Sequence, residues 1–224
     1  MANREFQQFK WNQQIDRDCR AIVRLAVEED LAGQQDWTSV SLVPEDREGA
    51  ANVVAREAGI VAGMPAVATV IEEMSAKLKA EIRVQDGDAF EAGTMLIALN
   101  GRVRDLLTVE RTLLNLLARL MGIATLAGEY AAKVEGTAAK VYDTRKTTPG
   151  WRRLEKYAVH CGGAANHRMG LYDAILIKDN HLAQRAASSL VADAVRDARD
   201  YVEANSKLQG MVIQVEVDLS LIHI

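Results

Sequence analysis

The stretch that decides the fold is VYDTRKTTPGWRRLEKYAVHCGGAANHRMGLYDAILIKDNH at residues 141–181, with MVIQVEVD following at 211–218. Three short apolar runs in this part of the chain, AAKVYDT, DAILIKDN and MVIQVEVD, alternate with two helical runs. This βαβαβ rhythm predicts a parallel sheet or barrel. Each predicted strand ends in a charged cluster, at residues 143–146, 178–181 and 216–218. Because (β/α) barrels build their active sites at the carboxyl ends of strands, the clusters predict a functional site.

The same segments carry five cations at points where loops meet the predicted scaffold. They are Arg145, Lys146, His167, Arg168 and Lys178. An arginine fork matches a carboxylate or phosphate in bidentate fashion, and a lysine adds a point charge. Together these residues predict a site for a multiply anionic small molecule.

Each feature also has a plainer interpretation. A charge at one strand end usually marks only where the chain meets water, and a single histidine is more often structural. The pair Gly162-Gly163 either makes a turn or lets backbone N–H groups approach an anion. Arg152 and Arg153 are interpreted as a solvated helix face. A nucleic-acid patch would need further basic and stacking aromatic residues, which the charge balance does not supply.

Composition limits the class of protein. The chain has 224 residues and a net charge of −4, which allows one large domain or two modest ones and argues against a dedicated nucleic-acid binder. The two cysteines, Cys19 and Cys161, form no CxxC unit, so neither a disulfide framework nor a zinc site is predicted. The polar N-terminus lacks an apolar signal region, and we expect a cytoplasmic location.

The first half of the chain is expected to form a small α+β domain. Apolar spacing predicts a helix over about 11–31, then a loop at 36–46 and a strand over 50–61. A helix opened by Gly63 and Pro65 is expected to reach about Leu78, and two strands are expected within 80–99.

The segment at 102–136 is strongly helical, and Gly122 predicts its division into two helices. Arg111 lies on the first, where the pattern alone indicates only a surface charge partner. We expect a domain boundary in this region, with one domain over 1–115 and a second over 116–218.

Several segments resemble the signature segments of quinolinate phosphoribosyltransferases, in the order in which that family has them. They are EEDLAGQQDWTS (28–39), ERTLLNLLARLMGIAT (110–125), YDTRKTTPGWRRLEKYAVHCGG (142–163), ANHRMGLYDAILIKDNH (165–181) and VEVD (215–218). The resemblance implies an α/β fold in which an N-terminal α/β sandwich domain precedes an incomplete (β/α) barrel. It implies a head-to-tail homodimer that transfers phosphoribosyl from PRPP to quinolinate in NAD biosynthesis, with Mg²⁺ accompanying PRPP.

The resemblance also implies roles for single residues. Arg145, His167 and Arg168 are expected to hold the carboxylates of quinolinate, and Thr147 to line the same loop. Lys146 and Lys178 are expected where quinolinate meets PRPP, and Glu216 beside the ribose and the magnesium-bound pyrophosphate. These last three are the expected catalytic residues. Arg111 is expected to reach into the partner's site.

Three departures from the family pattern are visible. Ala164 stands where a third glycine is usual, which is tolerated if its φ is negative, and Trp151 replaces a common leucine as a packing residue. The family continues past VEVD, whereas this chain ends in LSLIHI at 219–224. We expect this tail to be non-native and the 224-residue fragment to be unstable and inactive.

Two alternatives remain. One is a sister enzyme of the same fold that acts on another ring carboxylate, for which a full set of four carboxylate-facing cations would be unnecessary. The other is a non-catalytic anion-binding paralogue, which would not bind PRPP and magnesium together with quinolinate.

Overall fold

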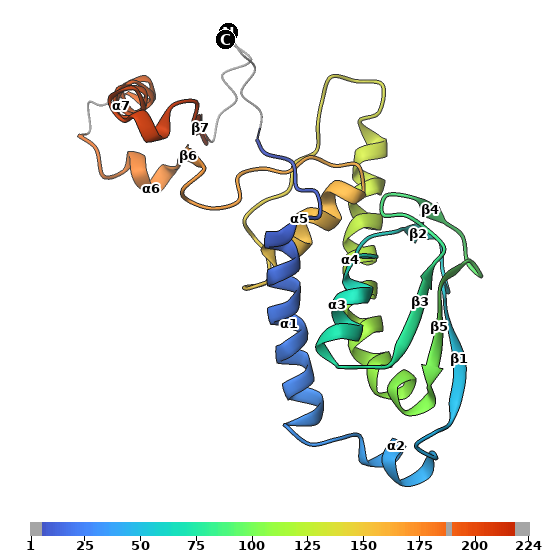
Figure 1. The fold of residues 1–224 in the computed structure, drawn as a ribbon. Helices are drawn as coiled ribbons and strands as arrows, with labels where there is room; N and C mark the ends of the chain where they lie inside the picture. The colour runs from blue at the N-terminus through green and yellow to red at the C-terminus, as the bar shows by residue number, and fades with distance from the viewer. Residues whose placement is uncertain (1–5, 187–189, 218–224) are drawn as a thin grey trace. The chain divides into compact units, whose positions relative to one another are not determined.

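The computed structural model describes residues 6–186 and 190–217 (Figure 1). The tail predicted to be non-native, 219–224, lies outside them. The chain forms two compact units. The larger is Gln8–Asn166, and the smaller takes in the described residues before Gln8 and from His167 onward. Each unit is described by itself.

The larger unit carries most of the secondary structure. Its elements are α1 (Gln13–Leu31), α2 (Trp37–Leu42), β1 (Glu48–Val54), β2 (Gly59–Ile60), α3 (Ala66–Glu73), β3 (Leu78–Ile82), β4 (Ala89–Phe90), β5 (Met95–Arg102), α4 (Val103–Lys133) and α5 (Arg152–Cys161). The smaller unit contains β6 (Ala174–Ile177), α6 (Asp179–Leu182), α7 (Val191–Ala204), the 3₁₀ helix η1 (Ser206–Leu208) and β7 (Val212–Val215).

The larger unit is built in layers. Strand β5 is the centre of an antiparallel sheet, paired with β1 on one side and β3 on the other, and β2 pairs with β4. Helices α3 and α4 lie against the sheet, and α1 packs on α3 (Figure 1). The core contains Ile97 of β5 and, from α4, Leu113, Leu117 and Leu120. All four side chains are at most 2% exposed. The α/β fold predicted from the sequence is confirmed.

Helix α1 follows the predicted spacing closely. The side chain of Asn12 accepts hydrogen bonds from the amides of Gln14 and Ile15, which caps the first turn. Ile15, Cys19 and Val23 recur every four residues and are fully buried. The helix predicted over 11–31 is therefore confirmed to within two residues.

Four predictions in the first half are wrong. The strand expected over 50–61 is divided into β1 and β2, which belong to different sheets, and three strands rather than two follow α3. The stretch at 36–46, expected to be a loop, contains α2, because the carboxylate of Asp36 accepts from the amide of Ser39 and caps a helical turn. The helix expected to reach Leu78 ends at Glu73. Ser75 turns the chain with a φ of 52°, and Leu78 begins strand β3.

The predicted break at Gly122 is also wrong, because α4 runs unbroken through it. A glycine inside a helix costs only about 1 kcal/mol relative to alanine. Leu120 and Ala124 on either side are fully buried, and their packing outweighs that cost. The boundary expected at 115/116 falls inside this helix and stays a prediction.

The smaller unit contains two of the three predicted barrel strands. β6 and β7 pair in parallel, from Ala174 beside Val212 to Ile177 beside Val215, and α7 packs on β7. The first predicted strand, AAKVYDT, is reduced to one parallel bridge between Tyr142 and Ala165 in the larger unit. Within the described residues no barrel closes, as expected for an incomplete one.

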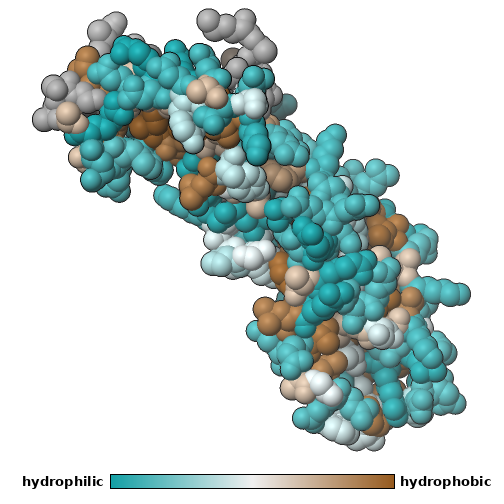
Figure 2. All heavy atoms as spheres, turned by 60° about the vertical axis from the view of Figure 1, so that its left-hand side comes forward, coloured by the Kyte–Doolittle hydropathy of each residue, from teal (hydrophilic) through white to brown (hydrophobic). Residues whose placement is uncertain are grey.

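The surface carries both hydrophilic and hydrophobic side chains. On the face in Figure 2 the hydrophobic residues lie scattered among hydrophilic ones. In the part of the chain that the structure describes, no helix has the length and apolar character needed to cross a membrane.

Candidate functional site

The segment Arg145–Trp151, here called the RKTTPGW loop, joins the bridge at Tyr142 to helix α5. Tight turns shape it: the amide of Lys146 donates to the hydroxyl of Thr144 at 3.0 Å, and the amide of Thr147 donates to the carbonyl of Arg145 at 3.0 Å. The loop thereby brings three of the predicted site residues, Arg145, Lys146 and Thr147, next to one another.

Arg145 carries an unsatisfied donor. Its Nε is buried and has no hydrogen-bond partner in the described part of the chain. Leaving a buried donor unpaired costs about 1–3 kcal/mol, and more when the group is charged. Lys146, beside it in the sequence, is exposed. The loop therefore presents one partly buried and one accessible cation, an arrangement suited to an anionic ligand.

Two arginines outside the predicted site hold this loop. The Nε of Arg152 donates to the hydroxyl of Thr147 at 2.9 Å. Arg119 of α4 donates to the hydroxyl of Thr148 at 2.5 Å, and its guanidinium lies 5.0 Å from the ring centre of Trp151. The packing role predicted for Trp151 is confirmed.

The interpretation of Arg152 and Arg153 as a solvated helix face is wrong. Arg152 binds the loop, as described, and Arg153 pairs with Asp18 of α1 at 2.6 Å, with both side chains 22% exposed. Tertiary partners on other elements, which helical spacing does not reveal, explain the difference.

A buried polar cluster lies at the start of the loop, and no sequence pattern predicted it. The ammonium of Lys156 is fully buried and pairs with the carboxylate of Asp143. The amide of Asn166 donates to the same carboxylate at 2.8 Å and to the backbone carbonyl of Lys156 at 2.7 Å. Asp143 precedes Arg145 by two residues, so this cluster fixes the start of the loop.

In the smaller unit, Lys178 and Glu216 come together at the carboxyl ends of β6 and β7. Their charged groups lie 3.0 Å apart, with side chains 43% and 62% exposed. The Nε2 of His167 lies 2.7 Å from the amide oxygen of Gln214. Gln214 and Glu216 are two residues apart on an extended segment, so their side chains leave it on the same face. His167, Lys178 and Glu216 thus gather around one end of β7.

Arg168 has a structural contact in addition to its predicted role. It is 5% exposed, and its Nη1 donates to the carbonyl of Ala174, the first residue of β6, at 2.9 Å. The guanidinium therefore helps to hold the strand that leads to Lys178. Its role with a carboxylate of the substrate stays a prediction.

The glycine pair after α5 ends the helix, and its amides are occupied by helix carbonyls rather than free for an anion. The amides of Gly162, Gly163 and Ala164 all donate to carbonyls in the last turns of α5. A Cβ on Gly162 would lie 2.2 Å from the carbonyl oxygen of Ala124 in α4, which explains the glycine. The φ of Ala164 is negative, so the condition for tolerating its methyl is met.

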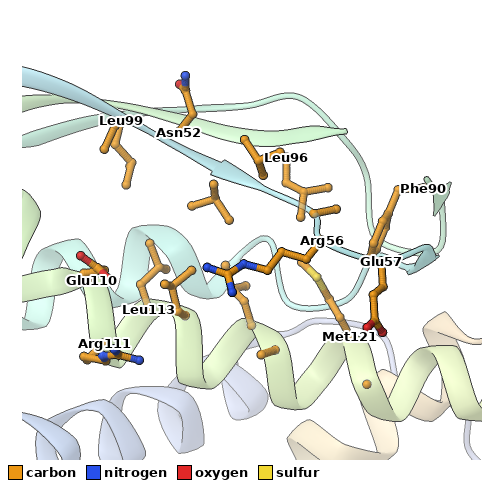
Figure 3. Close-up of a pocket in the computed structure, with 18 of the residues that line it drawn as sticks. Asn52, Arg56, Glu57, Phe90, Leu96, Leu99, Glu110, Arg111, Leu113 and Met121 are labelled. Atoms are coloured by element: carbon orange, nitrogen blue, oxygen red, sulfur yellow. The ribbon is translucent and has the colours of Figure 1, made fainter. Parts of the chain in front are cut away.

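Arg111 lies on α4, exposed, at a broad cavity (Figure 3). The cavity has a volume of about 1090 Å³ and lies between α4 and the strands β1 and β5. Leucines from both sides line it, and Arg56, Glu57 and Glu110 add charge. Among the described residues none forms a hydrogen bond or ion pair with the Arg111 side chain. No sequence pattern predicted this cavity.

The site residues thus divide between the two units. Arg111, Arg145, Lys146 and Thr147 belong to the larger one, and His167, Arg168, Lys178 and Glu216 to the smaller. The described residues contain no group of three or more histidine, cysteine, aspartate or glutamate side chains placed to hold a metal ion.

Comparison with known proteins gives a consistent result. Residues 36–121 match the model of the quinolinate phosphoribosyl transferase N-terminal domain, and residues 123–221 match that of its C-terminal domain. The chain is 42% identical over 182 residues to a nicotinate-nucleotide pyrophosphorylase [carboxylating] of Mycobacterium leprae, covering 80% of this chain and 63% of that protein. It is 38% identical over 201 residues to a mitochondrial quinolinate phosphoribosyltransferase [decarboxylating] of Nicotiana tabacum, covering 90% and 55%.

The fold agrees with these relatives. The nicotinate-nucleotide pyrophosphorylase structure from Francisella tularensis superposes with a TM-score of 0.81 at 34% identity, covering 95% of this chain and 70% of that one. The chain spans between 55% and 63% of the length of the two curated relatives above.

Proposed function

We propose a function on the premise that this chain belongs to the quinolinate phosphoribosyltransferase family. The reaction is transfer of the phosphoribosyl group of PRPP to the ring nitrogen of quinolinate, with loss of pyrophosphate and carbon dioxide. The product is nicotinate mononucleotide, an intermediate of NAD biosynthesis.

The observation that carries the proposal is the unpaired, buried Nε of Arg145. Quinolinate is a planar dianion, and a guanidinium fork matches a carboxylate in shape and charge. A substrate carboxylate would satisfy this donor and remove the cost of leaving it unpaired. We assign the same task to His167 and Arg168, so that three cationic or polar donors meet the two carboxylates.

The chemistry requires few covalent roles from the protein. The ring nitrogen attacks the anomeric carbon, the carbon–oxygen bond to pyrophosphate breaks, and the nitrogen becomes cationic. The adjacent carboxylate then leaves as carbon dioxide, its electron pair stays on the ring carbon beside that nitrogen, and the carbon takes up a proton. Lys146 and Lys178 are proposed to hold the two anionic reactants together and to screen their repulsion.

Glu216 is proposed to face the ribose and the pyrophosphate with its magnesium ion. Magnesium is usually bound by one or two carboxylates together with substrate phosphates and water. The exposed carboxylate of Glu216, paired with Lys178 at the end of β7, is proposed to lie beside the magnesium-bound pyrophosphate. When bound, the ion supplies charge neutralisation for the departing pyrophosphate.

We propose further that two chains form a homodimer in which Arg111 serves the partner's site. The exposed position of Arg111, without a pairing side chain in the described residues, supports this role. We expect the reaction to run in the cytoplasm, where the two free thiols, Cys19 and Cys161, stay reduced.

The test is an assay for nicotinate mononucleotide with the product of the gene cloned from genomic DNA. Quinolinate and nicotinate are compared as acceptors, in the presence and absence of PRPP and magnesium. When PRPP and magnesium are present, we expect turnover with quinolinate and none with nicotinate. We expect Arg145→Ala to lose this turnover. Equal use of nicotinate would instead indicate a sister enzyme. Binding of quinolinate without any product would indicate an anion-binding paralogue.

A further inference from the structure

We propose that Arg119 is a positioning residue that ties the RKTTPGW loop to helix α4. It touches neither reactant in this assignment, and it acts by fixing the loop that presents Arg145 and Lys146. The expected change in KM for quinolinate rests on the proposed function, whereas the restraint of the loop by Arg119 does not.

Three contacts meet at one guanidinium. Its Nη2 donates to the hydroxyl of Thr148 at 2.5 Å and to the carboxylate of Glu155 in the first turn of α5. Its carbon lies 5.0 Å from the ring centre of Trp151, which places the cation over the aromatic face. Glu155 is only 12% exposed, so this ion pair is screened less than a surface pair.

The central residues of the loop are exposed, so a contact with a neighbouring helix restrains them. Thr148, Pro149 and Gly150 are all exposed, and Gly150 adopts a φ of +83° that glycine accepts readily. Arg152, which holds Thr147, belongs to α5 and therefore moves with the element that follows the loop. Arg119 connects the loop to a different helix. A loop fixed before binding avoids the conformational entropy cost of ordering when the substrate arrives.

The geometry favours arginine over lysine at this position. A planar guanidinium donates along two directions in its plane while its face stacks on the indole of Trp151. A lysine at 119 could keep the ion pair with Glu155 but not the flat contact. The loop amides of Arg119→Lys should therefore exchange at a rate between those of the wild type and of Arg119→Ala.

Arg153→Ala provides a matched control. Arg153 is also an arginine in an interhelical ion pair, with Asp18 of α1 at 2.6 Å, and none of its described contacts is with the loop. Both alanine variants lose one guanidinium and one salt bridge. Only Arg119→Ala removes a contact to Thr148 and Trp151.

The first measurement is hydrogen exchange of the loop amides. The amides of Thr147 and Trp151 close the loop's turns, each at 3.0 Å from a carbonyl of the loop. We expect their exchange to be about tenfold faster in Arg119→Ala and unchanged in Arg153→Ala. Trp151→Leu, which removes the stacked indole, should give a smaller increase at the Thr147 amide and keeps the measurement possible if Arg119→Ala fails to fold.

The second measurement is steady-state kinetics with quinolinate. We expect Arg119→Ala to raise KM by about tenfold, which corresponds to 1.36 kcal/mol, and to change kcat much less. If loop exchange in Arg119→Ala and Trp151→Leu equals that of the wild type, the positioning role is wrong whatever the activity. If exchange rises but KM changes no more than in Arg153→Ala, the loop is tied without consequence for binding, and the role is also wrong. A wild-type enzyme without activity would overturn the proposed function and leave the exchange result to decide the tie.

Discussion

The ammonium of Lys156, which has no exposed surface, pairs with the carboxylate of Asp143, two residues before Arg145. The side-chain amide of Asn166, which directly precedes His167, donates to the same carboxylate and to the backbone carbonyl of Lys156. One buried cluster therefore holds both the start of the RKTTPGW loop and Asn166, the residue before His167. A buried ion pair is a weak source of stability, so a role in fixing these two segments explains it better.

Breaking this pair should be costly. We expect Lys156→Met to lower the free energy of unfolding by about 3–5 kcal/mol, because it leaves the Asp143 carboxylate buried without its cation. The double variant Lys156→Met/Asp143→Leu should regain part of the loss. Urea unfolding measures both, with the exposed Lys79→Met as control, expected within about 0.5 kcal/mol of wild type. A loss below about 1 kcal/mol for Lys156→Met would contradict the structure.

Sequence reasoning found what depends on local pattern. The parallel strands β6 and β7, with Lys178 and Glu216 at their ends, follow from apolar runs that stop at charges. It missed Lys156, because a charge in a helical run is usually a solvated residue, and only the tertiary partner Asp143 reveals its burial. It missed Arg119 for the same reason. At Gly122 it overrated a local preference that packing overcomes.

Arg168→Ala should impair quinolinate use far more than PRPP use. A hydrogen bond to a charged group contributes about 1.5–3 kcal/mol, which corresponds to a loss in catalytic efficiency of about ten- to several-hundred-fold. Since Arg168 also holds the carbonyl of Ala174, thermal stability should fall as well. Initial rates with each substrate varied in turn test this, with Arg185→Ala, an ion-pair variant of the same unit, as control. An equal loss of affinity for both substrates would reject the assignment.

The trans role of Arg111 can be tested by complementation. Arg111→Ala and Lys178→Ala subunits should each be nearly inactive alone. Mixed under conditions of subunit exchange, they should regain activity, because each heterodimer contains one site with both residues intact. Native mass spectrometry verifies that heterodimers form. Heterodimers without recovered activity would place Arg111 in its own chain's site or outside any site.

The stability of the protein should fall as the pH is lowered through the titration of His160. Burial, with a smaller effect of Lys10, holds the pKa of this half-buried imidazole below its usual 6.5. The unfolded chain therefore binds the proton first, so the free energy of unfolding decreases as the pH falls from 6.5 toward the folded-state pKa and is unaffected above 6.5. Urea midpoints between pH 5 and 8 should show this slope in the wild type and a weaker one in His160→Gln. Identical slopes would show that His160 does not contribute.

The unbroken course of α4 fixes the angular phase between two arginines. Arg111 and Arg119 are eight residues apart, which gives a rise of about 12 Å and a rotation of about 80° around the helix axis. One residue inserted between them would turn one arginine by about 100° relative to the other. The segment 112–118 should therefore tolerate exchanges of side chain better than any change in its number of residues.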